Sequence, residues 1–307
     1  MPSTDLGTKV GSVVLPNPVM TASGTSGHGT ELGAYGPLAD LGAVVVKSVS
    51  AEPWPGNPAP RVTEVAAGML NSVGLEGPGM TRWVAEDLAQ LRAAGARVVA
   101  SIWGRSVADY RRAAELLAPA VGDGTVVAVE VNVSCPNVED RGNMFAHSPS
   151  ATAAAVGASD CGVPRWAKLS PNVPDLREIA AAALSAGAES LTLVNTLLGM
   201  AIDVEHRRPA LGAGGGGLSG PAVHPVAVRA VFECRAAFPD AGIVGVGGVM
   251  NGRDAVELLL AGADAVQVGT ATFAEPRAPW RVLRELVRWC EQHGGTTVQE
   301  LVGAAHG

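Results

Sequence analysis

Eight short apolar runs alternate with alanine-rich amphipathic segments along the 307 residues, and this alternation restricts the fold more than any other feature. Strands that are almost continuously hydrophobic, each followed by a helix, are typical of a parallel sheet covered on both faces. The expected strands are Pro18–Ala22, Ala43–Lys47, Arg97–Ile102, Val126–Val131, Arg165–Leu169, Ser190–Val194, Gly242–Val246 and Ala265–Val268. Eight such units predict an α/β protein built as a single (β/α)8 or TIM barrel across residues 1–307.

The segments between these strands predict the helices and leave one alternative architecture open. Helices are expected at Thr81–Ala94, Val107–Ala120, Asp175–Ala186, Val223–Phe238 and Arg253–Leu260. Several are followed by a glycine directly before the next strand, where glycine supplies a left-handed C-cap. A doubly wound open sheet would need a dinucleotide-type loop after the first strand, and Ser23–Gly27 resembles one only weakly. The segment Gly7–Leu15 predicts a short N-terminal hairpin that closes the bottom of the barrel.

Composition excludes several classes of function. The net charge of −7 and the lack of a basic stretch argue against a nucleic acid or an anionic membrane as partner. No run approaches the roughly 20 apolar residues of a membrane span, and the N-terminus lacks the pattern of a secretory signal. Cys135, Cys161, Cys234 and Cys290 show no CxxC spacing. We therefore expect reduced thiols in a cytoplasmic protein, without a metal site or an iron–sulfur cluster.

Polar residues gather where the predicted strands end. The fourth strand runs into Asn132–Asn137, which places Cys135 between two carboxamides. Strand ends meet at one mouth of a barrel, where catalytic groups lie. Lys47 and Lys168 also end strands, and lysine is rarely buried without a partner. An anionic ligand at the mouth would explain both lysines; the alternative is that each reaches the rim or pairs with Glu130 or Glu52.

Glycine-rich segments suggest where a phosphate would bind. Gly245–Val249 and Gly269-Thr270 follow the last two strands, the usual phosphate site of such barrels. Gly68–Leu75 is expected to be a loop that lays Asn71 over a small polar ligand, or else a packed surface excursion. Ser219–Pro221 is expected to be a flexible loop that returns to the mouth. None of the six histidines has metal-ligand spacing, and His28, His147, His206 and His224 are expected to be solvated.

The motifs together resemble class 1 dihydroorotate dehydrogenases, and most closely the 1B type, the NAD-linked catalytic subunit. The resemblance extends over nearly the whole chain. It is carried by Asn17–Met20, Ala22–Thr25, Gly56–Pro58, Pro60-Arg61, Met69–Leu75, Asn132–Asn137, Lys168–Pro171, Val194–Thr196, Gly199–Asp203, Leu218–Pro221, Gly247–Val249 and Ala261–Thr270.

The resemblance implies an FMN-binding barrel that oxidises dihydroorotate to orotate in pyrimidine biosynthesis. Cys135 would be the base that takes the C5 proton while the C6 hydride passes to flavin N5. The pKa of an unperturbed thiol is about 8.5, so activity would rise toward alkaline pH. Lys168 would lie beside the flavin N1/O2 edge, and Lys47 would bind the orotate carboxylate.

The same resemblance assigns the remaining site residues. The cofactor would contact Ser23, Gly24, Lys47, Ser48, Ser101, Asn132, Lys168, Val194, Ser219, Gly220, Gly247, Gly248, Gly269 and Thr270. The substrate would contact Lys47, Asn71, Ser72, Val73, Gly74, Leu75, Asn132, Asn137, Asn195 and Thr196. The implied partners are an electron-transfer subunit with FAD and an iron–sulfur cluster, and a second copy of the chain in a homodimer.

The chain departs from the family pattern in three places. Ser101 and Trp103 stand where the family usually has an asparagine and then a small residue. Lys47–Ser50 and Arg141–Pro149 also differ from the usual sequences. The alternatives are a related flavin enzyme that acts on another dihydropyrimidine, and a 1A-like enzyme that reduces fumarate. An FMN-binding tRNA-modifying barrel and a non-catalytic flavin-binding subunit are less consistent with the charge and with the strand-end residues.

Overall fold

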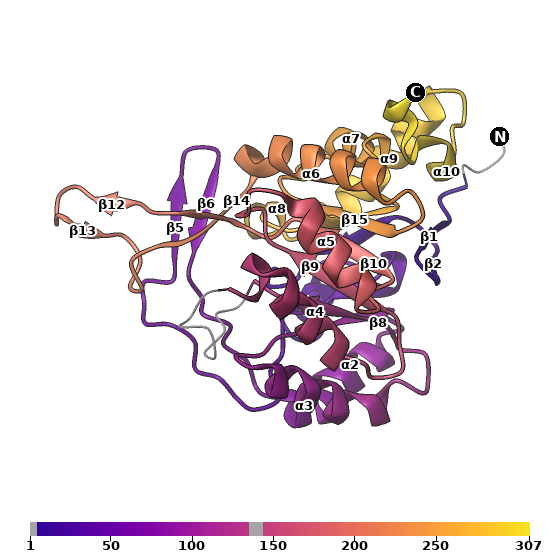
Figure 1. Ribbon diagram of the computed structural model, residues 1–307. Coiled ribbons are helices and arrows are strands. Elements are labelled where there is room, and N and C mark those ends of the chain that lie inside the picture. Colours follow the sequence, from indigo (N-terminus) through magenta and orange to yellow (C-terminus); the bar gives the residue numbers. More distant parts are fainter. Residues whose placement is uncertain (1–4, 135–143) are drawn as a thin grey trace.

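The computed structural model describes residues 5–134 and 144–307, and Figure 1 shows its course. Within these ranges, eight parallel strands form one sheet in the order β3-β16-β15-β10-β9-β8-β7-β4. A parallel bridge between Met20 and Ala43 joins the two outermost strands, so the sheet curls round into a barrel. The predicted (β/α)8 barrel is confirmed, and the open-sheet alternative is wrong.

The barrel strands coincide with the apolar runs of the sequence. They are β3 (Val19–Thr21), β4 (Val44–Val45), β7 (Val98–Ile102), β8 (Val126–Asn132), β9 (Arg165–Leu169), β10 (Ser190–Leu193), β15 (Gly242–Val246) and β16 (Ala265–Val268). Every residue of β7, β10, β15 and β16 is buried. This is why these runs show no alternation of polar and apolar residues, since both faces of a barrel strand are covered.

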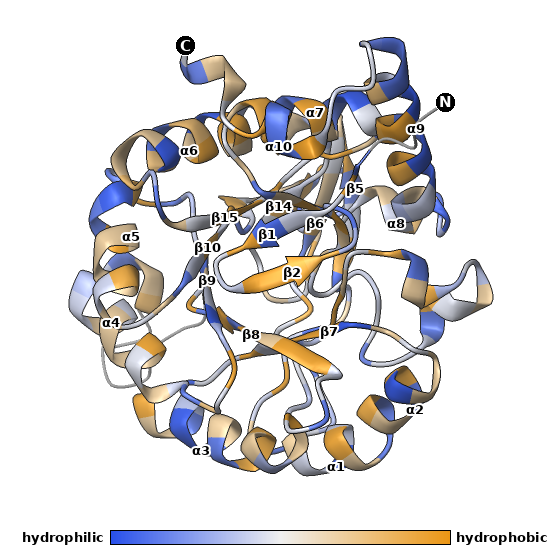
Figure 2. Cartoon of the chain, turned by 90° about the vertical axis from the view of Figure 1, so that its right-hand side faces the viewer, coloured by the Kyte–Doolittle hydropathy of each residue, from blue (hydrophilic) through white to orange (hydrophobic). Residues whose placement is uncertain are grey.

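Helices surround the barrel, as Figure 2 shows in a view that places β1 and β2 near the centre. They are α1 (Met80–Ala85), α2 (Asp87–Ala93), α3 (Val107–Leu117), α4 (Pro149–Ala158), α5 (Leu176–Ser185), α6 (His224–Ala237), α7 (Gly252–Leu260), α8 (Ala271–Ala274), α9 (Ala278–Gln292) and α10 (Val298–Leu301). Side-chain caps mark several starts: Ser106 with Asp109 and Asn251 with Asp254 form capping boxes on α3 and α7. Such caps satisfy amide groups that have no partner within the helix.

The predicted helix Thr81–Ala94 is divided at Glu86 into α1 and α2. Trp83 in α1 and Leu88 in α2 are both completely buried. At 3.6 residues per turn, one straight helix would point these two side chains roughly 140° apart. The break lets both enter the core.

An N-terminal hairpin closes one end of the barrel, as predicted. It consists of β1 (Thr8–Val10) and β2 (Val13–Leu15), which pair antiparallel. Val10 and Leu15 are fully buried in a cluster with the barrel residues Met20 and Trp166. The alternating burial of each strand follows from this placement, because one face covers the barrel and the other meets solvent.

A four-stranded antiparallel sheet stands at the opposite end, in the order β11-β14-β6-β5. Its strands are β5 (Val62–Val65), β6 (Gly68–Asn71), β11 (Leu197–Gly199) and β14 (Gly216–Ser219). Figure 1 shows β12 (Ile202–Asp203) and β13 (Arg208–Pro209) on an arm that extends beyond it. The prediction of loops was therefore wrong for Gly68–Asn71, which is a strand. It was also wrong for Ser219, which ends β14, because the two segments pair with each other.

No helix in the described ranges is long and apolar enough to cross a bilayer.

Candidate active site

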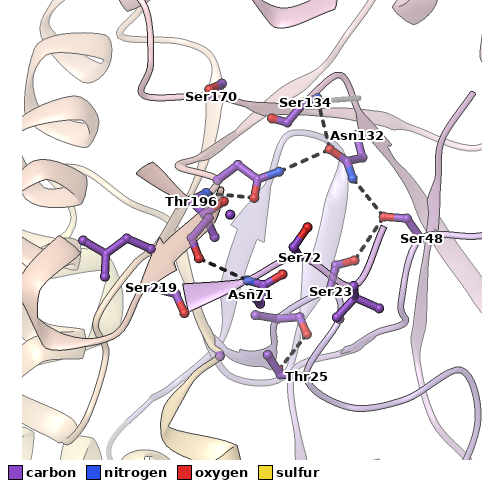
Figure 3. Close-up of a pocket in the computed structure, with 18 of the residues that line it drawn as sticks. Ser23, Thr25, Ser48, Asn71, Ser72, Asn132, Ser134, Ser170, Thr196 and Ser219 are labelled. Carbon is purple, nitrogen blue, oxygen red and sulfur yellow. Dashed lines mark hydrogen bonds between the residues drawn. The ribbon is translucent and has the colours of Figure 1, made fainter. Parts of the chain in front are cut away.

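A cavity of about 670 Å³ opens at the carboxyl ends of the barrel strands, beneath the antiparallel sheet. Its wall contains both polar and apolar groups, and Figure 3 shows hydroxyl and carboxamide side chains that meet around it. This is the end of a (β/α)8 barrel that carries active sites.

Most of the predicted site residues line this one cavity. They are Ser23, Gly24, Lys47, Ser48, Asn71, Ser72, Val73, Gly74, Leu75, Asn132, Lys168, Val194, Asn195, Thr196, Ser219, Gly220, Gly247, Gly248, Gly269 and Thr270. Ser101 is completely buried behind Ser48 and does not line the cavity. Cys135 and Asn137 lie outside the described residues.

Carboxamides at the ends of two barrel strands, β8 and β10, are joined by hydrogen bonds. Asn195 Nδ2 donates to Asn132 Oδ1 at 3.2 Å, and Asn132 Nδ2 donates to Ser48 Oγ at 3.1 Å. The backbone N–H of Ser134 donates to the same Asn132 oxygen at 3.1 Å. Asn71 reaches the cavity from the antiparallel sheet, where its Nδ2 donates to the Gly217 carbonyl. These bonds orient the amide groups, which can both donate and accept hydrogen bonds to a heterocyclic ligand.

Three serine hydroxyls form a chain that runs from the cavity wall, at Ser23 and Ser48, to the buried Ser101. The Ser48 and Ser101 oxygens are 2.8 Å apart, and those of Ser23 and Ser48 are 3.3 Å apart. Ser101 therefore supports Ser48 from a fully buried position, and the cofactor contact that the resemblance implies for Ser101 stays a prediction. A small side chain at position 101 leaves this space for the hydroxyl chain.

Trp103 forms part of the cavity wall, although only 2% of its surface is exposed. Its ring packs edge-on against Trp54, with centroids 5.9 Å apart, and the guanidinium of Arg105 lies 4.9 Å from the centre of the Trp54 ring. Its indole Nε1 is buried without a hydrogen-bond partner among the described residues. The sequence indicated Trp103, but it did not indicate Trp54 or Arg105, since no local pattern links them.

The glycines at the ends of β15 and β16 bring backbone close to the cavity. Gly248 has a φ of +66°, and a Cβ there would lie 2.7 Å from His224 Cβ and 2.9 Å from the Gly220 carbonyl. Gly220 itself has a φ of +104° and would place a Cβ 2.7 Å from Gly68 Cα. Beside them, Thr270 Oγ1 donates to Ser219 Oγ at 2.8 Å. Backbone and hydroxyl groups therefore line this part of the cavity, and a residue larger than glycine would not fit at position 220 or 248.

Lys47 is half-buried at the cavity and makes no ion pair among the described residues. Burial lowers the pKa of its amine, the nearby Glu76 raises it, and Arg61 lowers it. Arg61 and Glu76 pair with each other, which leaves the Lys47 ammonium for a ligand. The alternative of a pair with Glu52 or Glu130 does not hold for this lysine.

Lys168, in contrast, pairs with Glu130, which is one of the two partners that the sequence offered as an alternative to an anionic ligand. The Lys168 ammonium lies 3.9 Å from Glu130 Oε1 and donates to Gln267 Oε1 at 3.2 Å. Burial lowers the pKa of Lys168, and the charge of Glu130 raises it. Glu130 and Gln267 were visible in the sequence as lone polar residues in apolar strands, which is a usable signal for such a network.

Two histidines are less exposed than the sequence suggested. His28 is half-buried and its Nε2 has no hydrogen-bond partner in the described chain; burial and the charge of Lys47 lower its pKa to about 4. His224 begins α6, and its Nδ1 lies 2.8 Å from the Gly247 carbonyl. His206 is exposed, as expected.

Asn172 is a further cavity residue that the sequence analysis missed. Its Nδ2 donates to Ser170 Oγ at 2.8 Å and to the Thr196 carbonyl at 2.9 Å, while its Oδ1 accepts from the Leu198 backbone N–H. It therefore ties the end of β9 to the start of β11. The surrounding Ser-Pro-Asn sequence has the composition of an ordinary turn, so nothing local distinguishes it.

Comparisons with known proteins agree with this architecture. The family model described as dihydroorotate dehydrogenase matches residues 5–289. The chain is 48% identical over 299 residues to the dihydroorotate dehydrogenase B (NAD(+)) catalytic subunit of Desulforudis audaxviator, covering 97% of this chain and 96% of that one. It is 44% identical over 305 residues to the protein of the same name from Alkaliphilus oremlandii, with 99% of both chains covered. A barrel with this cavity, matched over nearly its full length by such relatives, belongs to the dihydroorotate dehydrogenase family.

Proposed function

We propose that the chain oxidises dihydroorotate to orotate with bound FMN, as the catalytic subunit of an NAD-linked enzyme of pyrimidine biosynthesis. The observation that carries this proposal is the convergence of three carboxamides and two lysines on one cavity at the strand ends. The names of the relatives agree with it and favour the NAD-linked type over a fumarate-reducing one.

The cavity suits FMN in size and in lining. The close-packed glycines Gly220 and Gly248, with the hydroxyls of Ser219 and Thr270, would hold the phosphate, because backbone can approach it closely only where no Cβ intervenes. Ser23, Ser48 and Lys168 would contact the ring system. When bound, FMN supplies a hydride acceptor.

The chain's own residues would bind and deprotonate the substrate. Lys47 would hold the carboxylate of dihydroorotate, and Asn71, Asn132 and Asn195 would pair with the ring N–H and C=O groups. Cys135 would take the proton from C5 as the hydride leaves C6, so that the C5–C6 double bond forms. Ser134, the residue before this cysteine in the chain, lines the cavity and donates its backbone N–H to Asn132 Oδ1.

An anaerobic titration with dihydroorotate tests the proposal, with the flavin absorption followed in the visible range. Stoichiometric bleaching with formation of orotate is expected. The Cys135→Ala variant should keep its FMN and lose the bleaching. Cys161→Ala is a matched control, since Cys161 is a buried thiol away from the cavity.

Each contrary result would reject a different part of the proposal. Normal bleaching by Cys135→Ala would exclude it as the base. A yellow protein that dihydroorotate does not reduce would exclude the substrate, and a protein that binds no FMN would exclude the cofactor.

The proposed assembly contains a homodimer of this chain and a subunit with FAD and an iron–sulfur cluster, located in the cytoplasm. The described cysteines Cys161, Cys234 and Cys290 are unpaired, which agrees with a reducing compartment. If the relay subunit is required, the isolated chain should reduce artificial acceptors and fail to reduce NAD. Sedimentation equilibrium would test the dimer.

A further inference from the structure

A carboxylate, a carboxamide and an ammonium group meet inside the barrel, at the floor of the cavity. Gln267 Nε2 donates to Glu130 Oε2 at 2.8 Å, and Lys168 Nζ donates to Gln267 Oε1 at 3.2 Å. The Lys168 ammonium lies 3.9 Å from Glu130 Oε1. The three residues come from β16, β8 and β9, and Glu130 and Gln267 are completely buried.

Glu130 is the charged group in the described chain that supports the charge of Lys168. Beside Lys168 in the sheet, β8 presents Asn132 and β10 presents Thr192, neither of which titrates. Burial disfavours the ammonium, and the Glu130 carboxylate favours it. An isolated ammonium at this depth would be costly, and the nearby Glu130 carboxylate offsets part of that cost for Lys168.

The geometry also leaves part of the ammonium group available. Among the described residues, Lys168 Nζ makes one hydrogen bond, to Gln267, and an ammonium has three donors. Gln267 bridges the pair and holds Nζ 3.9 Å from the carboxylate, a separation longer than that of a direct hydrogen bond. Lys168 lines the cavity, so its remaining donors can reach a ligand there.

We propose that Glu130 and Gln267 are positioning residues that hold Lys168 as an ammonium at the cavity floor, with donors free for the ring system of the bound cofactor. The inference rests on the proposed function, in which that ligand is FMN. A fixed positive charge at this place favours added negative charge on the ring, as a preorganised site does. Removal of the Glu130 charge would let burial convert the amine to its neutral form at a lower pH.

The test uses FMN-loaded protein and sulfite, which adds reversibly to flavins, bleaches their visible absorption and leaves negative charge on the ring. The sulfite dissociation constant is measured across the neutral and alkaline range. Lys168→Gln should bind sulfite at least about ten-fold more weakly at every pH. Glu130→Gln should bind it normally at low pH and lose affinity at least about one pH unit earlier than the unaltered protein. Glu233→Gln, which alters a half-buried carboxylate on α6 that pairs with Arg229, should match the unaltered protein.

Three results would contradict the inference or the function on which it rests, and each can be told from the others. A Glu130→Gln profile that coincides with that of the unaltered protein, while Lys168→Gln binds weakly, overturns the role of Glu130. A normal Lys168→Gln profile in a yellow protein shows that the ammonium does not face the ring, and overturns the inference without touching the cofactor assignment. Failure to take up FMN overturns the proposed function itself.

Unfolding measurements test the inference if a single variant is too unstable to bind FMN. Glu130→Gln or Lys168→Gln leaves one buried charge without its partner, whereas the double variant removes both. The double variant should unfold at a higher denaturant concentration than either single variant. If the effects of the two substitutions simply add, the pair is not coupled and the inference is wrong.

Discussion

Asn195 donates a hydrogen bond of 3.2 Å to Asn132 and so joins the ends of β10 and β8, two strands that are separated in the barrel by β9. The accepting oxygen also receives the backbone N–H of Ser134, and Asn132 donates in turn to Ser48. One carboxamide thus connects the walls of the cavity with the segment that leads to Cys135.

Replacement of Asn132 by alanine should weaken both the fold and ligand binding. The variant leaves Asn195, Ser134 and Ser48 without this partner, and lost buried hydrogen bonds cost about 1–3 kcal/mol. We expect the free energy of unfolding to fall by about that amount and orotate affinity to fall at least about ten-fold. Urea unfolding and calorimetric titration measure the two effects. Asn195→Ala should cost less, and an Asn132→Ala protein that binds orotate normally would contradict the proposed contact.

Alanine at Gly248 should abolish FMN retention. The added Cβ would come within 3 Å of His224 Cβ and of the Gly220 carbonyl, at a φ that disfavours side chains. Gly157 is the matched control: it lies on α4 with open space around it, so Gly157→Ala should stabilise the chain by about 0.5–1 kcal/mol. Flavin content after gel filtration and urea unfolding distinguish the two. Full flavin content in Gly248→Ala would place the phosphate elsewhere.

Trp103 should stabilise the protein through its ring and not through its N–H group. Trp103→Ala should lower the free energy of unfolding by about 3–5 kcal/mol, because a large buried side chain is lost. Trp103→Phe keeps an aromatic ring against Trp54 and loses an Nε1 that has no partner in the described chain, so its cost should be about 1–2 kcal/mol. Equal losses in the two variants would mean that the N–H group is bound after all.

His28 should make the fold sensitive to acid. Its folded-state pKa is lowered to about 4 by burial and by Lys47, against the opposing charges of Glu31 and Glu76. Between about pH 6.5 and about pH 4 the unfolded chain binds a proton that the folded chain does not, so stability falls as the pH falls. Because the side chain is only half-buried, we expect a loss of about 1–2 kcal/mol over this range.

The comparison for this prediction is His28→Gln, which cannot titrate. The variant should lose less stability than the unaltered protein when urea unfolding is repeated at about pH 7.5 and at about pH 4.5. Parallel losses in the two proteins would show that His28 is not responsible.

The barrel could be predicted because its strands are local features. Nearly every residue of the eight apolar runs is buried, and the turns between them contain glycine where the chain needs a positive φ, as at Gly95 and Gly187. The antiparallel sheet over the mouth could not be predicted in the same way. Two of the four residues of its strand β14 are glycines, so the strand shows no hydrophobic period, and its Gly217 pairs with Asn71, 146 residues earlier in the chain.

The candidate site, too, could be predicted only in part from the sequence. Lys47, Asn132, Lys168 and Asn195 were predicted from their positions at strand ends, and all four line one cavity. The support that Ser101 gives to Ser48, the packing of Trp54 on Trp103, and the burial of His28 were not predicted. Each depends on a neighbour supplied by another part of the chain.

By itself, the sequence determined the repeated strand–helix order, and with it the end of the barrel at which polar residues collect, because hydrophobic periodicity acts over a few residues. Only the tertiary structure decided that Gln267, 137 residues from Glu130 in the chain, would bridge Glu130 and Lys168. The energy of a buried charge depends on which groups lie within a few ångströms of it, and barrel closure sets those distances.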